Sequence, residues 1–304
     1  MATPSTPPAD LPRRRLLNQQ LLRPRLRSPA ELVAWFGAVQ AQDYLGSLWA
    51  VGQRLAQATE ADVERALAER TLVRTWPMRG TLHYVAAGDV RWMLALCTPR
   101  VIARSAGRHR QLGLDEAAFR RGAAALAREL EGGRQLARRE AYAALERGGV
   151  SPAGQRGLHV IGYLAQRGLI CFGPRQGRQP TFVLLDEWLP AAAAVPREEA
   201  LARLAGRYFA SHGPATVHDF AWWSGLPVKD ALAGIEGAGP RLVVPDGDGR
   251  RWRSAAEPPS RAARSPVASL LTSWDEYLVA YQDRDALVPH RRGRENRLQT
   301  VGGA

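Results

Sequence analysis

Cysteine is almost absent from this sequence: only Cys97 and Cys171 occur in 304 residues. Two cysteines this far apart form neither a disulfide framework nor a closely spaced metal site, so we expect both to be small buried hydrophobes in a reducing compartment. The sequence also lacks a histidine–cysteine–acid cluster at metal-ligand spacing, a glycine-rich phosphate loop and a serine–histidine–aspartate set. It therefore predicts no metal site and no cofactor.

Long apolar runs are missing as well. No stretch approaches the roughly 18 apolar residues that a membrane-spanning helix needs. The first 12 residues are rich in proline, threonine and serine and have no apolar segment of the kind that marks a secretory signal. We therefore expect residues 1–12 to be a disordered lead-in, and the protein to be cytoplasmic with no membrane partner.

Lysine is nearly missing, with Lys229 as its one representative, but arginine more than replaces it. Lys and Arg together number 42 against 29 Asp and Glu, which gives a formal net charge of +13. Because arginine carries the same charge as lysine, the excess still needs a counter-charge. The balance indicates a polyanionic partner, with nucleic acid preferred over an anionic membrane surface.

The sequence does contain one order of elements three times, namely helices followed by a β-hairpin. The three units are expected at residues 13–112, 113–195 and 196–265, and their hairpins at 71–85, 169–185 and 242–253. This is the winged-helix order, in which a helix enters a DNA groove and the hairpin touches the flanking backbone. The predicted fold class is mainly α with short β-hairpins (α+β), as tandem winged-helix motifs followed by a C-terminal segment at 266–304.

The stretch whose side chains are best suited to catalysis is Gln40-Ala41-Gln42-Asp43. Glutamine amides donate and accept hydrogen bonds but do not titrate, so a site built on Gln40 and Gln42 would work by positioning a water. The competing interpretation is that both glutamines cap helix ends or bond backbone groups. Asp43 would place negative charge near a developing cation, although a helix N-cap is the interpretation we favour.

Basic side chains accompany the first two hairpins. Arg74 and Arg79 flank Trp76 near the first turn, a combination typical of phosphate contacts, although Trp76 itself is expected in the core. Arg175 and Arg178 lie at the tip of the second hairpin. There they would either enter a minor groove or form a solvated loop.

Four separated motifs carry a resemblance to one family, and they are Gln40–Gln42, Arg74–His83, a helix-turn-helix pattern at 215–227, and Trp274–Arg284. In this order they resemble the winged-helix DNA glycosylases typified by AlkZ, with the related AlkX group, over nearly the whole chain from about residue 13. The family's Gln-aliphatic-Gln signature falls on Gln40 and Gln42. The resemblance implies a concave, C-shaped arrangement of tandem winged helices with a basic surface on duplex DNA.

The resemblance also implies removal of N7-alkylated purines, including bulky natural-product adducts and, in some branches, interstrand crosslinks. An N7-alkylguanine is already cationic, so the leaving base needs no acid, and what remains is to orient a water beside an oxocarbenium-like sugar. Asp43 and His83 are candidate supports, and His83 would bond a phosphate or the lesion, or serve as a structural histidine. Family members usually continue with a short β-rich piece after the part that matches 294–304, so we expect either a truncated gene or an incomplete last module.

We therefore expect a monomeric, monofunctional DNA glycosylase that hydrolyses the N-glycosidic bond of alkylated bases in double-stranded DNA, in repair or self-resistance. The alternative is a non-catalytic winged-helix DNA-binding protein such as a transcriptional regulator. A regulator would normally dimerise on a palindromic site, and the sequence has no heptad or obvious dimer helix. A third interpretation is a sensor that binds the alkylating compound itself.

Overall fold

The computed structural model describes residues 11–239, 242, 254 and 268–284. Its helices are α1 (Leu11–Asn18), α2 (Pro29–Phe36), α3 (Tyr44–Gly52), α4 (Glu60–Ala68), α5 (Val90–Gln111), α6 (Glu116–Leu130), α7 (Arg138–Arg147), α8 (Arg156–Gln166), α9 (Leu185–Trp188), α10 (Arg197–Ser211), α11 (Val217–Ser224), α12 (Val228–Gly237) and α13 (Glu276–Val279), with a 3₁₀ turn at Ala87–Asp89. Its strands are β1 (Val39–Gln40), β2 (Leu72–Met78), β3 (Thr81–Ala86), β4 (Leu136–Ala137), β5 (Ile170–Gln176) and β6 (Gln179–Leu184). Helices with short antiparallel strands confirm the predicted α+β class.

Several of the segments expected from the sequence are not described by the structure. The third hairpin, most of the linker after it and residues 285–304 lie outside the described residues. The end of the expected lead-in at residues 1–12 overlaps α1, which begins at Leu11, whose side chain is fully buried. The tandem winged-helix arrangement and its concave shape stay predictions.

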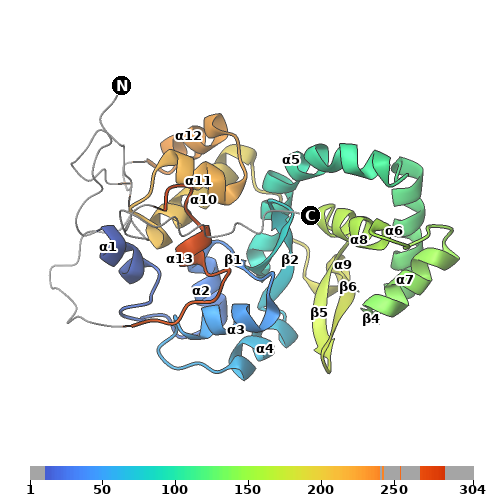
Figure 1. Cartoon of the computed structure of the whole chain (residues 1–304), viewed down its shortest axis with the longest axis horizontal. Coiled ribbons are helices and arrows are strands. Elements are labelled where there is room, and N and C mark those ends of the chain that lie inside the picture. Colours follow the sequence, from blue (N-terminus) through green and yellow to red (C-terminus); the bar gives the residue numbers. More distant parts are fainter. Residues whose placement is uncertain (1–10, 240–241, 243–253, 255–267, 285–304) are drawn as a thin grey trace, which may run out of the picture.

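The first two hairpins share one sheet. The strand order is β1-β3-β2-β5-β6-β4, and every neighbouring pair is antiparallel. The β2–β3 hairpin joins the β5–β6 hairpin through the pairing of Arg74 with Phe172. Figure 1 shows β5 and β6 extending beside β2, with α6, α7 and α8 on the far side of this hairpin from the N-terminal helices. The second hairpin therefore extends the sheet that contains β1.

The buried side chains of the sheet are divided among three cores. On β2, Leu72 packs with the helices α2–α4, whereas its neighbour Val73 packs with α5 and α10. Trp76, further along β2, joins the core of α6–α8 and lies 5.0 Å from the Phe172 ring, centroid to centroid. The prediction that Trp76 belongs to the core is thus confirmed.

Helix α2 delivers the chain to β1. Ser28 and Glu31 form the capping box that the sequence predicts, since the Glu31 N–H donates to Ser28 Oγ and the Ser28 N–H donates to the Glu31 carboxylate. Gly37 ends the helix at φ +86°, a conformation that side chains rarely adopt. The turn at Gly37 places residues 39–41 along β3.

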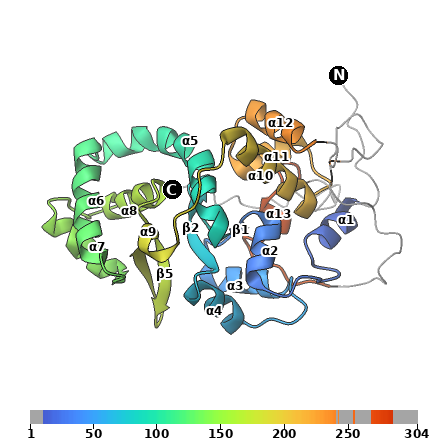
Figure 2. The ribbon, with the colours of Figure 1, turned by 180° about the vertical axis from the view of Figure 1, so that it is seen from behind.

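Residues 268–284 return to the N-terminal part of the chain. In Figures 1 and 2, α13 lies next to β1, α2 and α11. The Asp275 carboxylate accepts two hydrogen bonds from the Arg54 guanidinium, at 2.6 and 2.8 Å, and both side chains are buried. Tyr281 is also buried, and its hydroxyl contacts Gln19 and the His212 carbonyl oxygen. This late segment is therefore part of the core.

Candidate active site

Gln40 lies at the free edge of the sheet. It faces His83 across the β1–β3 ladder, and the pairing continues one residue further because the Ala41 N–H donates to the Leu82 carbonyl at 2.8 Å. Val39 and Ala41 point into the core of α2–α4, so the side chain of Gln40 points to the opposite face, the one that His83 shares. This face carries the polar groups of the site.

The side chain of Gln40 is 5% exposed and has a spare acceptor. Its Oε1 is buried and makes no hydrogen bond to the part of the chain that the structure describes. A buried amide oxygen without a partner is costly, and the cost is recovered when a ligand or water donates to it. Gln40 is thus poised to accept a hydrogen bond from outside the described chain.

Gln42 is exposed, and its side chain makes one hydrogen bond to the backbone. Its Oε1 accepts the Leu82 N–H at 3.2 Å, in the place that a backbone carbonyl would occupy if β1 continued. An amide oxygen has two lone pairs, so one remains, together with the amide NH₂ group. The structure therefore makes one glutamine a backbone partner, as the competing interpretation supposed, without removing its capacity to bind a further group.

Arg74 holds the segment between the two glutamines. Its Nε and Nη2 donate to the Ala41 carbonyl oxygen at 3.0 and 2.8 Å, and Nη2 also lies 3.4 Å from the Gln42 carbonyl oxygen. The guanidinium is 9% exposed and lies near the rings of Tyr44 and Phe172. Burial lowers its pKa, but arginine stays charged. Arg74 was predicted to contact DNA, whereas its donors here point into the protein.

Arg79 and His83 form a second internal pair. Arg79 donates to the Trp223 carbonyl oxygen, and its Nη2 lies 3.2 Å from His83 Nε2. His83 Nδ1 is 3.0 Å from the Thr81 carbonyl, so the histidine donates from Nδ1 and accepts at Nε2. Burial, assisted by the Arg79 charge, lowers the pKa of His83 to about 3. His83 is therefore a neutral, satisfied histidine with no free nitrogen for a phosphate.

Asp43 occupies the N-cap position of α3, as favoured above, but its side chain makes no capping hydrogen bond. The carboxylate lies over the first turn of the helix, where a Cβ at Gly46 would come within 2.5 Å of Oδ2. The side chain is exposed beside Gln42. Its negative charge is thus presented to solvent next to the glutamines.

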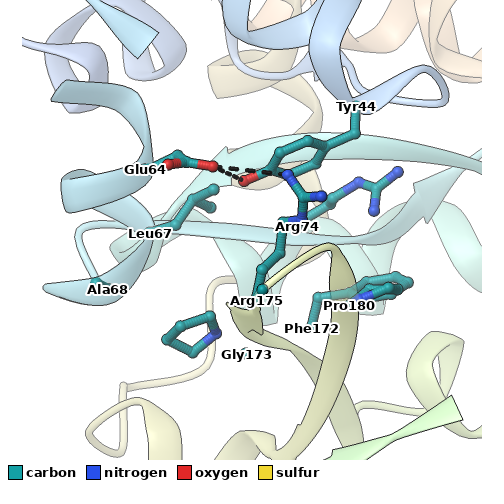
Figure 3. A pocket seen from close by; sticks show the side chains of 11 residues that line it. Tyr44, Glu64, Leu67, Ala68, Arg74, Phe172, Gly173, Arg175 and Pro180 are labelled. Atoms are coloured by element: carbon teal, nitrogen blue, oxygen red, sulfur yellow. Dashed lines mark hydrogen bonds and ion pairs between the residues drawn. The ribbon is translucent and has the colours of Figure 1, made fainter. Parts of the chain in front are cut away.

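Arg175 and Arg178 differ in their surroundings. Arg175 lies over the Tyr44 ring, 4.3 Å from its centroid, and its Nη1 is 3.7 Å from Glu64 Oε1, which also accepts the Tyr44 hydroxyl. Figure 3 shows Tyr44, Glu64 and Arg175 pointing toward one another, with Arg74 behind the tyrosine ring. Burial and the Glu64 charge raise the pKa of Tyr44 to about 12, so it remains a donor. Arg178, at the hairpin tip, is exposed.

The residue that sequence reasoning missed is Glu276. Its Oε1 accepts the Gln40 N–H at 2.6 Å, and its Oε2 lies 3.0 Å from Trp223 Nε1 and 3.4 Å from His212 Nε2. The signal was present, since Glu276 belongs to the Trp274–Arg284 motif, but neither spacing nor charge indicates that residue 276 reaches residue 40.

Within 11–239 and 268–284, no three His, Cys, Asp or Glu side chains gather as metal ligands. In the same ranges, no helix has the length and apolar character needed to cross a membrane.

The comparisons with known proteins place this arrangement in one class. A family model described as "DNA glycosylase AlkZ-like" matches residues 33–299. The chain therefore belongs to the AlkZ-like DNA glycosylases, enzymes that act on N-glycosyl bonds in DNA. Over 301 residues it is 29% identical to the interstrand DNA cross-link repair glycosylase of Streptomyces sahachiroi, covering 92% of this chain and 80% of that protein. The solved structure of Streptomyces sahachiroi DNA glycosylase AlkZ matches with a TM-score of 0.74 at 26% identity, over 90% of this chain and 78% of that one.

Proposed function

We propose that this glycosylase removes N7-alkylated purines from duplex DNA by hydrolysis, with bulky adducts and interstrand crosslinks among its substrates. The observation that carries the proposal is the buried Oε1 of Gln40, which has no partner in the described chain and lies on a fixed strand next to the exposed Gln42. Crosslink repair by the Streptomyces relative, and the net charge of +13, support a DNA lesion as the substrate.

The proposed reaction needs no acid, because an N7-alkylated purine leaves as a neutral base. Gln40 Oε1 and the second lone pair of Gln42 Oε1 accept hydrogen bonds from one water and hold it near the anomeric carbon. The carboxylate of Asp43 supplies negative charge beside the oxocarbenium-like sugar. As the water oxygen bonds to the anomeric carbon, the water loses one proton to bulk solvent, which the exposed Gln42 and Asp43 border. His83 takes no proton in this scheme, because it is neutral and both ring nitrogens are engaged.

For DNA contact we propose the second hairpin, through the exposed Arg178 and the half-buried Arg175. Arg74 and Arg79 support the site from within, since their guanidiniums donate to protein carbonyls. The protein acts as a monomer without a cofactor, through winged-helix units at 13–112, 113–195 and 196–265, in repair or self-resistance.

The test is base release from a duplex that carries a single N7-methylguanine or a bulky N7 adduct. The expected result is release by the wild-type protein and a loss of at least 100-fold in Gln42→Ala and Gln40→Ala. Gln57→Ala, an exposed glutamine between α3 and α4, is the matched control and should be fully active. No release from either duplex, with DNA binding intact, would refute hydrolysis and favour the DNA-binding protein.

Crosslinks are tested separately. A duplex joined through two N7-alkylguanines should separate into single strands on a denaturing gel after treatment with the wild-type protein and heat. Release of monoadducts without separation of the crosslinked duplex would restrict the substrate to monoadducts.

A further inference from the structure

A buried carboxylate from the late part of the chain is hydrogen-bonded to the strand of the candidate site. Glu276 is 1% exposed, lies 236 residues after Gln40 in sequence, and accepts the Gln40 N–H at 2.6 Å. This distance is typical of a strong bond to a charged acceptor. The two other donors to the carboxylate, Trp223 and His212, come from α11 and the end of α10.

The geometry of β1 explains why Gln40 needs this partner. Successive N–H groups of a strand point to opposite sides, and the Ala41 N–H points toward β3, so the Gln40 N–H points away from the sheet. β1 is the edge strand, and in the sheet that the structure describes no neighbouring strand lies on that side. Without Glu276 this buried donor would be unsatisfied, and the strand around Gln40 would be held from the β3 side alone.

The ionisation of Glu276 fits the role of an acceptor. Burial pushes the pKa of Glu276 up, but its hydrogen bond with His212 outweighs burial and holds the pKa below its ordinary value. Burial lowers the pKa of His212, against the raising effect of the Glu276 carboxylate beside it. The carboxylate therefore presents two acceptor oxygens, one to Gln40 and one to Trp223 and His212.

We propose that Glu276 is a positioning residue for base excision: its carboxylate fixes the peptide of Gln40 and so aims the Gln40 amide at the water that attacks the sugar. This inference rests on the function proposed above, and it assigns to the Trp274–Arg284 motif a part in the reaction. Glu276 does not touch the substrate. It acts through Gln40.

Glu276→Gln is the informative variant. A glutamine has one oxygen and one NH₂ group, so it cannot accept from Gln40 on one side and from Trp223 and His212 on the other. Because Trp223 and His212 both lie on one side, the amide oxygen is expected to face them. The NH₂ group then faces the Gln40 N–H, and two donors cannot form a hydrogen bond. The expected result is a single-turnover rate of base release reduced about 10- to 100-fold, with the Kd for the same duplex unchanged within about twofold.

Asp275→Asn is the matched control. Asp275 is the adjacent residue and is equally buried, but its carboxylate pairs with Arg54 and caps α13. It makes no hydrogen bond to Gln40. This variant should melt at a lower temperature yet release base at the wild-type rate when assayed well below its melting temperature.

The outcomes separate cleanly. A Glu276→Gln rate within twofold of wild type overturns the inference, as does an equal loss of rate in both variants, which would indicate general loosening. If Glu276→Gln does not fold, hydrogen exchange of the Gln40 backbone amide in the wild-type protein tests the inference. Exchange as fast as in an exposed strand would overturn it, and strong protection would support it. A wild-type protein that releases no base refutes the proposed function, and the inference falls with it.

Discussion

Replacing Arg74 by lysine tests how the segment between the two glutamines is held. The guanidinium places two donors on the Ala41 carbonyl oxygen, and it lies near the ring of Phe172. Lysine keeps the charge but concentrates it on one ammonium group, which cannot reproduce the fork.

The size of the effect follows from these contacts. Losing a hydrogen bond from a charged donor costs about 1.5–3 kcal/mol, and losing a guanidinium–ring contact costs about 0.5–1 kcal/mol. We therefore expect Arg74→Lys to reduce the free energy of unfolding by about 2–4 kcal/mol. The rate of base release should fall about tenfold, because the carbonyls of Ala41 and Gln42 are less firmly placed.

Urea unfolding followed by tryptophan fluorescence measures the first effect, and single-turnover base release measures the second. Arg65→Lys is the control. Arg65 is 59% exposed, and among the residues that the structure describes it pairs only with Asp62 in the same helix turn, so its change should stay within about 0.5 kcal/mol. An Arg74→Lys protein as stable and as active as Arg65→Lys would refute the reasoning. It would return Arg74 to the phosphate-contacting function that the sequence predicts, which lysine fulfils equally well.

Three further predictions concern other parts of the molecule. The pKa of His83 is about 3 in the folded state against an ordinary 6.5, so the unfolded chain binds the extra proton and stability falls as the pH drops below 6.5. Between pH 7 and pH 5, His83 should lower the free energy of unfolding by about 2 kcal/mol. Urea unfolding of His83→Gln should therefore show a shallower pH dependence than the wild-type protein. Gly37→Ala should cost about 1–3 kcal/mol of unfolding free energy because of its φ of +86°, whereas Gly88→Ala, which faces open space, should cost less than 1 kcal/mol. Arg178→Ala should lower the slope of log binding constant against log salt concentration by about one phosphate contact, and the rate of base release at saturating protein should stay unchanged. An unaltered slope would show that Arg178 does not contact the DNA.

Local patterns predicted the parts of the fold that depend on neighbours in sequence. The capping box at Ser28 and Glu31 was readable because both partners lie within one helix turn. The first two hairpins were readable because apolar side chains alternate around a turn. The signature at Gln40–Gln42 is equally local, and its first glutamine lies on β1.

What could not be read depends on long-range geometry. The single pairing of Arg74 with Phe172, which merges two hairpins into one sheet, joins segments nearly 100 residues apart and leaves no trace in either one. The internal contacts of Arg74 and Arg79 could not be predicted from the sequence for a related reason. A positive charge near a turn indicates a polyanionic partner, yet in the structure both guanidiniums donate to carbonyl oxygens of the protein itself.

The hydrogen bond between Glu276 and Gln40 also has a consequence for how the enzyme is made. The strand with the two glutamines emerges from the ribosome early, but its acceptor follows 236 residues later. At about 5–20 residues per second, the Gln40 N–H waits roughly 12–47 s for its partner. A nascent chain can therefore form its first hairpin long before the carboxylate of Glu276 is available to the Gln40 N–H.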